Sequence, residues 1–243
     1  MCCLVLPVAV SPGQVFNDFE GGTVGGQWGF RQPTFSGSTS ANLQPQSTPN
    51  TNNIMQVTQG FDIDSTKVGE VRFNFLDSSP NRWLRLTTSG ATGVPNPAVP
   101  LSGLLSFDIY SVAPIQVALG IRETGGSGPV GANGGSSGTI EWLGAQRATA
   151  SAATPPGGKP VIAGTWQTVT FNFATDPVFA FTGDGTLTGS WGVLENIAIT
   201  SQGDTDQHIY LDNFQVTAVP EPSAVAFLLL GGATLVYCWR RRA

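Results

Sequence analysis

Cysteine, histidine and charged residues are all scarce in this sequence of 243 residues. The three cysteines are Cys2, Cys3 and Cys238, so residues 14–222 contain none and cannot form an internal disulfide bond. The one histidine, His208, leaves too few ligands for a zinc site. A serine–histidine–aspartate triad would have to use His208, and the sequence has no G-x-S-x-G elbow between a strand and a helix to supply the serine. We therefore expect that the protein is not an enzyme.

Good helix formers in periodic runs are also scarce outside the C-terminal segment, whereas the chain has 31 glycines and 17 prolines. This composition argues against a helix-rich fold. Only 11% of residues are charged, and residues 14–222 hold eight basic and sixteen acidic side chains. An acidic surface repels the phosphates of nucleic acids, so the sequence argues against a nucleic-acid partner.

Ten segments alternate apolar and polar residues with the period of two that is typical of antiparallel strands with one buried face. No helical pattern separates them. We therefore expect an all-β fold over residues 14–218, namely a two-sheet antiparallel β-sandwich of jelly-roll type. Segments rich in Ser, Thr, Pro or Gly, at 32–53, 90–100, 125–138 and 148–160, should be surface loops. The expected strands are 15–20, 54–58, 70–76, 82–87, 104–112, 115–122, 139–144, 166–173, 195–201 and 208–217.

The last 25 residues read VPEPSAVAFLLLGGATLVYCWRRRA. Residues 224–239 carry no charge and would span about 24 Å as a helix, slightly less than a ~30 Å hydrocarbon core. We expect a single marginal transmembrane helix there. Arg240, Arg241 and Arg242 should stay in the cytoplasm, which places the body on the other side of the membrane. The alternative, a buried C-terminal helix, would bring three arginines against a hydrophobic core.

This segment resembles a PEP-CTERM sorting domain, because a Pro-Glu-Pro motif, an apolar span and a basic cluster follow one another over residues 219–243. The resemblance implies bacterial export, processing by an exosortase-type membrane enzyme, and delivery to the cell envelope or an exopolysaccharide matrix. Pro220, Glu221 and Pro222 are then the recognition residues, and the three arginines are the stop signal. The prolines disfavour helix, which would leave an extended peptide for the processing enzyme.

The first 13 residues, MCCLVLPVAVSPG, form a short apolar run that ends in small residues. They look like the last part of a secretory signal peptide cleaved before Gln14, although the basic region that begins such peptides is missing. One interpretation is that the natural start lies upstream. The other is that these residues form a buried first strand.

The last expected strand contains a break in its alternation. Ile209 and Leu211 alternate, and the apolar face then resumes at Phe214 after three residues instead of two. One extra residue in a strand predicts a β-bulge at Asp212-Asn213.

The segments FNDFEGGTVGGQW and IYLDNFQV resemble the terminal strands of galactose-binding-like jelly rolls, which include many carbohydrate-binding modules. The resemblance implies that the first and last strands pair and that Glu20 and Asp212, with Asp18 as an addition, hold a structural calcium ion. Calcium takes six to eight oxygen ligands, so backbone carbonyls would have to complete the site. The alternative is that Asp212 caps the bulge and Glu20 is solvated.

Tryptophan provides the candidate sugar-binding residues. Most large aromatic side chains fill a core, but Trp83 and Trp142 lie in short strands next to charged residues and loops. We expect these two side chains to face a glycan.

These observations predict an exported, non-catalytic protein of the cell surface or extracellular matrix that binds carbohydrate or exopolysaccharide. Its expected partners are an exosortase-type enzyme, the membrane and a polysaccharide, and calcium is its one expected cofactor. The first alternative is a structural or adhesive envelope protein without glycan binding. The second is a secreted glycan-acting enzyme, since a glycosidase needs only two suitably placed carboxylates.

Overall fold

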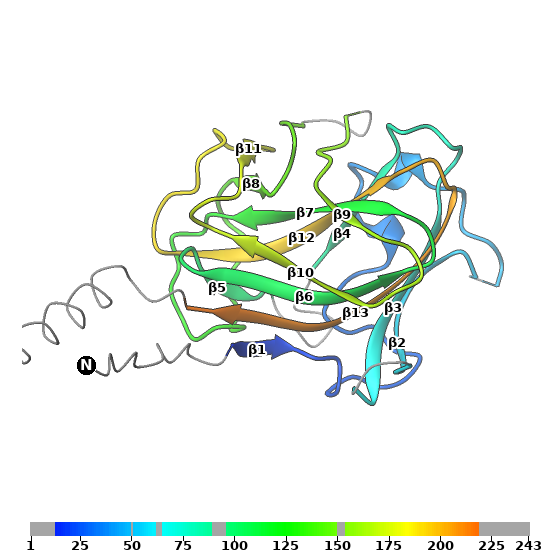
Figure 1. Cartoon of the computed structure of the whole chain (residues 1–243), viewed down its shortest axis with the longest axis horizontal. Helices are drawn as coiled ribbons and strands as arrows, with labels where there is room; N and C mark the ends of the chain where they lie inside the picture. The colour runs from blue at the N-terminus through cyan, green and yellow to red at the C-terminus, as the bar shows by residue number, and fades with distance from the viewer. Residues whose placement is uncertain (1–12, 50, 62–64, 89–95, 150–153, 219–243) are drawn as a thin grey trace, which may run out of the picture.

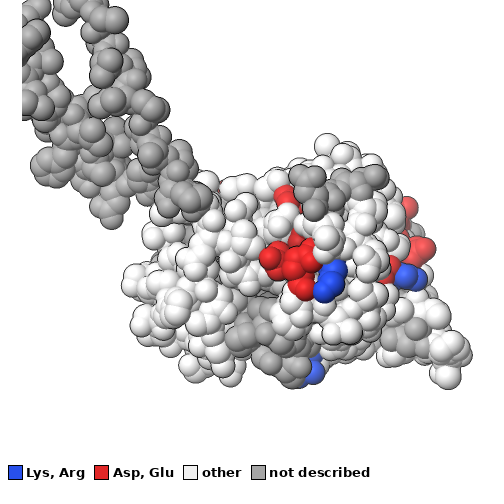
Figure 2. Space-filling model, turned by 90° about the horizontal axis from the view of Figure 1, so that it is seen from below, with Lys and Arg blue, Asp and Glu red and all other residues white. Residues whose placement is uncertain are grey.

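The computed structural model describes residues 13–49, 51–61, 65–88, 96–149 and 154–218. Within these ranges the chain folds into two antiparallel sheets that pack face to face (Figure 1). The all-β, two-sheet sandwich that the sequence predicts is confirmed. Figure 2 shows one face, where acidic side chains gather beside a basic group while most of the remaining surface carries neither charge.

The six-stranded sheet has the order β10-β6-β13-β3-β2, with β1 also paired to β13. The seven-stranded sheet has the order β11-β8-β7-β12-β4, with β5 paired to β12 and β9 paired to β7. The strands are β1 (Gln14–Asn17), β2 (Asn53–Gln59), β3 (Lys67–Asn74), β4 (Trp83–Thr87), β5 (Ala98–Pro100), β6 (Leu104–Ser111), β7 (Ile115–Arg122), β8 (Ile140–Leu143), β9 (Lys159–Val161), β10 (Gln167–Asn172), β11 (Val178–Ala180), β12 (Trp191–Ser201) and β13 (Asp206–Thr217). Two short 3-10 helices, η1 (Pro33–Phe35) and η2 (Ser40–Asn42), precede β2.

The core lies between the two sheets and consists of the residues that alternation assigned to the inner faces. In β6, for example, Leu105, Phe107 and Ile109 are fully buried. All ten expected strands are present, with boundaries that shift by a few residues. The sequence missed β5, β9 and β11, because each has only three residues and too short a pattern to detect.

Strand β13 carries the predicted bulge. Its first half pairs with β3 as far as Leu211, and its second half pairs with β1 from Phe214 onward. The pairing with β6 shifts in register at the same place, and Asn213 has a φ of 50°. The predicted pairing of the first and last strands is therefore present, and the bulge marks the change of partner.

Phenylalanine rings fill the space beneath this bulge. The Phe214 ring lies 4.7 Å from that of Phe107 and 5.5 Å from that of Phe30, measured between centroids. Phe19 has a φ of 58° and directs its ring over Gly69, the partner of Leu211 in β3. A β-carbon at Gly69 would collide with this ring, so the junction requires glycine there.

Three predicted segments lie outside the described residues: the signal-peptide remnant except Gly13, the sorting segment from residue 219 onward, and the transmembrane helix within it. No helix in the described ranges has the length and apolar character needed to span a bilayer.

Replacing Gly69 with Ala should lower the free energy of unfolding by about 1–3 kcal/mol, because the added methyl group overpacks the site under Phe19. Without that collision, alanine would be favoured over glycine within a strand. A β-carbon added at Gly37 would meet no atom within 4 Å, so Gly37→Ala is the matched control. Chemical denaturation measures both variants. Equal stabilities would contradict the packing described for Phe19.

Candidate functional site

The structure places the three predicted calcium ligands around the junction of β1, β3 and β13 but gives them different contacts. The Glu20 carboxylate accepts hydrogen bonds from the backbone N–H groups of Thr66 (2.8 Å) and Lys67 (2.9 Å) and from the Thr66 hydroxyl. These bonds, the Thr66 hydroxyl foremost, lower the pKa of Glu20. The Lys67 ammonium donates to the carbonyl oxygens of Glu20 (2.8 Å) and Gly22 (2.9 Å). Glu20 thus attaches the loop after β1 to the start of β3.

Asp212 lies at the bulge and is fully buried. Its Oδ1 accepts a hydrogen bond from the Asn213 N–H at 2.8 Å, whereas Oδ2 has no hydrogen-bond partner among the described residues. Burial raises the pKa of Asp212 to about 6, and the charges of Asp108 and Asp18 add to the rise against the lowering effect of Ser65 and Asn213. Asp18 itself accepts a hydrogen bond from the Glu20 N–H.

The three side chains make separate contacts, and the calcium site stays a prediction. Among the described residues, no group of three or more His, Cys, Asp or Glu side chains lies where it could hold a metal ion. The carboxylates of Glu20 and Asp212 serve different contacts, and the positive charge of Lys67 takes two carbonyl oxygens that a cation would need. Backbone carbonyls would have to supply most of the six to eight oxygens that calcium prefers.

Trp83 and Trp142 are buried, and this is a correction to their expected surface position. Both indoles have no exposed area and pack edge to face, with centroids 5.7 Å apart. They lie on the outer face of the seven-stranded sheet over small side chains, with the partly buried rings of Phe179 and Phe181 against them; the small residues are Ala118, Ala145 and Ala198. Neither indole face is free to stack on a sugar in this structure.

Several buried polar atoms in and beside this pair of indoles have no hydrogen-bond partner among the described residues. Nε1 of Trp83, Nε1 of Trp142 and both side-chain polar atoms of Asn196 are buried and lack hydrogen-bond partners among the described residues. The Asn196 amide lies over Gly120, where a β-carbon would collide with it. Buried groups of this kind ordinarily bind ordered water or a ligand.

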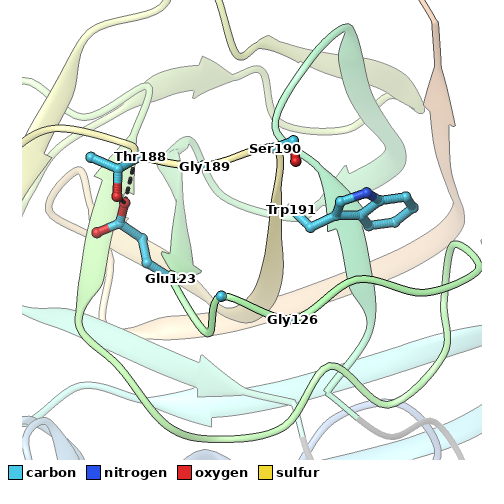
Figure 3. A pocket seen from close by; sticks show the side chains of 7 residues that line it. Glu123, Gly126, Thr188, Gly189, Ser190 and Trp191 are labelled. Carbon is cyan, nitrogen blue, oxygen red and sulfur yellow. Dashed lines mark hydrogen bonds between the residues drawn. The ribbon is translucent and has the colours of Figure 1, made fainter.

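A pocket of about 380 Å³ opens at one end of the same sheet, where β7 ends and β12 begins (Figure 3). Glu123 and Trp191 stand on opposite sides of it, with Thr188 beside Glu123. The remaining lining residues are Gly125, Gly126, Gly189 and Ser190. Because glycines line much of the wall, a ligand can approach the backbone closely.

The Glu123 carboxylate is held in place by hydroxyl and N–H groups. Its Oε1 accepts hydrogen bonds from the N–H and the hydroxyl (2.7 Å) of Thr188, and Oε2 accepts one from the Thr139 hydroxyl at 3.3 Å. Each carboxylate oxygen can accept more than one hydrogen bond, so Glu123 remains a fixed acceptor for a ligand. Trp191 is half-buried and lines the other side, with its indole directed away from Glu123 (Figure 3).

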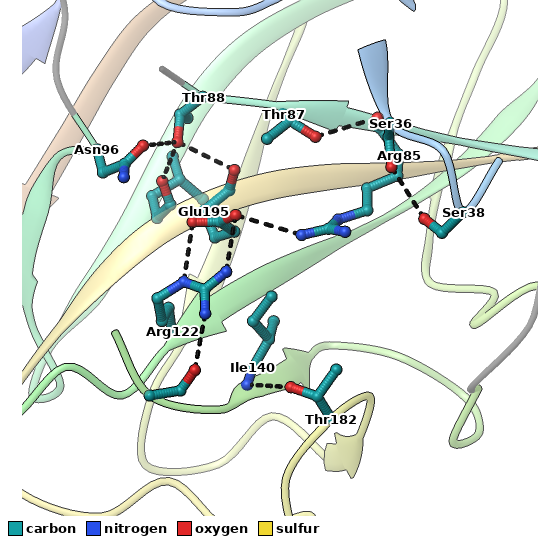
Figure 4. Close-up of polar contacts among 12 residues, drawn as sticks. Ser36, Ser38, Arg85, Thr87, Thr88, Asn96, Arg122, Ile140, Thr182 and Glu195 are labelled. Atoms are coloured by element: carbon teal, nitrogen blue, oxygen red, sulfur yellow. Dashed lines mark hydrogen bonds and ion pairs between the residues drawn. The ribbon is translucent and has the colours of Figure 1, made fainter. Parts of the chain in front are cut away.

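A buried ion-pair network fixes the two strands that form this pocket (Figure 4). Glu195 accepts two hydrogen bonds from Arg122, at 2.9 and 3.0 Å, and forms an ion pair with Arg85 at 3.2 Å. Arg122 also donates to the carbonyl oxygen of Gly138 at 2.7 Å, at the far end of the loop that supplies Gly125 and Gly126. The network thus ties one wall of the pocket to β12.

The sequence analysis missed Glu123 and Trp191. Each lies at a junction between a strand and a Gly-rich segment, in IRETGGSG and GTLTGSWG, and this is the one local signal that could have marked them. Their proximity follows from the pairing of Arg122 with Val193, about 70 residues further along the chain. Pairings of this kind cannot be deduced from alternation alone.

A scan against protein families matches the C-terminal segment to one described as a PEP-CTERM protein-sorting motif. Residues 218–242 are a PEP-CTERM sorting motif. The resemblance noted in the tail is thereby confirmed, and the motif indicates an exported protein associated with the envelope through exosortase processing. A search of curated proteins returns no match.

Carbohydrate-binding modules are among the structural neighbours of the chain. The family 11 module of the cellulosomal cellulase Lic26A-Cel5E of Clostridium thermocellum aligns at 15% identity and a TM-score of 0.43, over 87% of this chain and 97% of that one. CBM28, a module specific for non-crystalline cellulose, aligns at 13% identity and a TM-score of 0.38, over 88% and 100%. A family 30 module aligns at 10% identity and a TM-score of 0.36, over 73% and 88%.

Asp212 should make stability depend on pH. Because the pKa of Asp212 is about 6 in the folded protein and near 4 when unfolded, the folded state binds the proton more tightly. The contribution of Asp212 to the free energy of unfolding should therefore fall by ~2–3 kcal/mol as the pH rises from about 4 to about 7. Carboxylates with a lowered pKa, such as Glu20, act in the opposite direction, so the effect is read as the difference between the natural protein and Asp212→Asn. Asp212→Asn should remove this fall and be more stable than the natural protein above pH 7.

Urea denaturation across this pH range measures the effect, with the exposed Asp204→Asn as the control. A stability difference between the natural protein and Asp212→Asn that stays constant through this window would contradict the assignment. Stabilisation by added calcium that Asp212→Asn abolishes would instead favour a calcium site at the bulge.

Proposed function

We propose that this protein is an exported, non-catalytic β-sandwich that binds a carbohydrate chain in the pocket between Glu123 and Trp191. In this proposal residues 1–13 belong to the export signal, residues 14–218 form the ectodomain, and residues 219–243 are the sorting segment. Residues 224–239 of that segment cross the membrane until an exosortase-type enzyme removes it. The body is then delivered to the envelope or to an exopolysaccharide matrix.

The observation that best supports carbohydrate binding is the pocket. Sugars present apolar C–H faces and a rim of hydroxyl groups, so their sites combine an aromatic side chain with fixed hydrogen-bonding groups. Trp191 lines one side of the pocket, and the Glu123 carboxylate, held by Thr188 and Thr139, lines the other. Rotation of the Trp191 side chain would bring the indole over a bound sugar. Its volume of about 380 Å³ accommodates one or two sugar residues.

The negative charge of the body and of the pocket indicates which class of glycan would bind. The body carries 15 acidic and 8 basic side chains, and Glu123 is the one charged residue that lines the pocket. Carboxylates repel uronic acids, so this surface favours a neutral polysaccharide.

The lining of the pocket also supports a binding role without catalysis. Glycoside hydrolysis ordinarily requires two carboxylates about 5 to 10 Å apart on either side of the bond. The seven lining residues include one carboxylate, that of Glu123. This carboxylate already accepts three hydrogen bonds from Thr188 and Thr139.

Trp191→Ala should weaken binding to neutral polysaccharide about tenfold or more, because the variant loses the apolar stacking surface. Affinity gel electrophoresis of the full chain in detergent, with hydroxyethylcellulose, xylan and mixed-linkage β-glucan, measures the retardation. Phe35, another aromatic residue with 54% exposure, supplies the control variant Phe35→Ala. If no polysaccharide retards the natural protein, the sandwich is a spacer. If Trp191→Ala binds as well as the natural protein, the site lies elsewhere.

The sorting role predicts that replacing Pro220, Glu221 and Pro222 with alanine leaves the tail attached. Without the prolines the motif can join the helix, so the extended peptide is lost. Mass spectrometry of protein co-expressed with an exosortase should show the intact chain for this variant and a shortened chain for the natural sequence. A double substitution of the exposed Gln202 and Asp204 should be processed normally. Normal processing of the alanine variant would refute recognition through this motif.

A further inference from the structure

A row of aromatic side chains crosses the outer face of the six-stranded sheet, on the sheet that does not carry the pocket. Tyr110 in β6 pairs with Tyr210 in β13, and Tyr210 pairs with Glu70 in β3. Trp166 directly precedes β10, where the pairing of Gln167 with Ile109 places it next to Tyr110. Three rings and one carboxylate therefore form a continuous line across four strands. We call Trp166, Tyr110 and Tyr210 the aromatic row.

The rings of the aromatic row are close together and partly exposed. The centroid of Tyr110 is 5.9 Å from that of Trp166 and 6.0 Å from that of Tyr210. Phe61, from the loop between β2 and β3, packs within 4.5–5.7 Å of all three rings, and its carbonyl oxygen accepts a hydrogen bond from Trp166 Nε1 at 2.9 Å. The outer face of a solvated antiparallel sheet is ordinarily polar, so this row departs from the pattern.

Fixed polar groups continue the row beyond Tyr210. Although burial opposes it, hydrogen bonds from His208, Gln56 and Arg72 hold the pKa of Glu70 at about 2, so its carboxylate is ionised. His208 Nε2 lies 2.8 Å from Glu70 Oε1, and the imidazole lies against Tyr210 with centroids 4.5 Å apart. An apolar strip that ends in oriented donors and acceptors suits an amphipathic ligand.

Two acidic side chains lie beside the aromatic row, two residues away along β6 and β13. Asp108 is paired with Asp212 in the register of β6 and β13, one step beyond the aromatic row on the same face. Thr168 and Asn213 donate hydrogen bonds to Asp108, and no Lys or Arg of the described residues forms an ion pair with Asp108 or Asp212. The negative charge of Asp108, which has no cationic partner among the described residues, disfavours an acidic ligand.

We propose that the aromatic row is a second carbohydrate-binding face, which takes a neutral polysaccharide lying across β10, β6 and β13. Strands are about 4.8 Å apart, so the three rings span about 10 Å, which matches two consecutive sugar residues. This face does not depend on the pocket at Glu123 and Trp191. With both sites occupied, one molecule joins two polysaccharide chains.

Tyrosine is a specific probe for this face, because the chain has three tyrosines and two of them are in the aromatic row; the third is Tyr237 in the sorting segment. Nitration of the full chain in detergent, followed by peptide mass spectrometry, reads each tyrosine separately. Hydroxyethylcellulose, xylan or mixed-linkage β-glucan should slow nitration of Tyr110 and Tyr210 at least threefold, and polygalacturonate should not. Protection should persist in Trp191→Ala, which removes the pocket site.

Trp166→Ala tests the row itself, with Phe35→Ala as the control and thermal unfolding as the measure of stability. Loss of protection in Trp166→Ala, beyond any change in Phe35→Ala, supports the proposal. Protection that is unchanged in Trp166→Ala, while only the melting temperature falls, shows that these rings merely pack the loop and overturns it. Absence of protection by all three neutral probes overturns it as well, even where retardation through Trp191 persists. Protection that disappears in Trp191→Ala overturns the independence of the two sites.

Discussion

The change of partner along β13 is the constraint on which the six-stranded sheet depends. One edge of β13 pairs with β6, and its other edge serves β3 first and β1 afterwards. A one-residue shift in a strand turns every following side chain to the opposite face. The extra residue at Asp212-Asn213 makes that shift where the partner changes, so that Leu211 and Phe214 both point into the core. The aromatic packing around Phe214 then holds the terminal strands to the sandwich.

Strand β12 also contains a bulge. Each of the two bulges carries a buried acidic residue, and the two residues are stabilised in different ways. The shift in β12 lies between Leu194 and Asn196, and Glu195 stands at it. Burying a charge is unfavourable unless the charge is paired or neutralised. Two arginines pair with Glu195, whereas Asp212 has no cationic partner in the described part of the chain and its pKa rises instead. The paired acid supports the pocket, and the unpaired acid lies beside the aromatic row, so each bulge lies next to one of the two proposed binding surfaces.

Sequence alone was enough to predict the longer strands, the bulge in β13 and the sorting motif, because each leaves a local pattern. Period-2 alternation marks a strand with one buried face, and a break of three residues marks one extra residue. The burial of Trp83 and Trp142 left no such pattern, since it depends on Ala118 and Ala198 in two other strands. The contacts of Glu20 likewise depend on Thr66 and Lys67, 46 and 47 residues away. To predict a site assembled from distant strands, one must know which residues of neighbouring strands pair. Alternation within one strand does not give this register.

The pairing of the first and last strands also decides how the exported body presents its surfaces. Gln14 lies opposite Val216, so β1 begins where β13 ends, at one end of the sandwich (Figure 1). The pocket lies toward this end, because Ser190 accepts a hydrogen bond from Leu101, and Gly103 contacts Thr217. Tyr210 stands seven residues before the end of β13, about 24 Å along the strand at 3.4 Å per residue. A body held by the segment after β13 therefore keeps the pocket near its attachment and presents the aromatic row farther out. Pairing of the terminal strands thus places the two proposed binding surfaces at different distances from the end of β13.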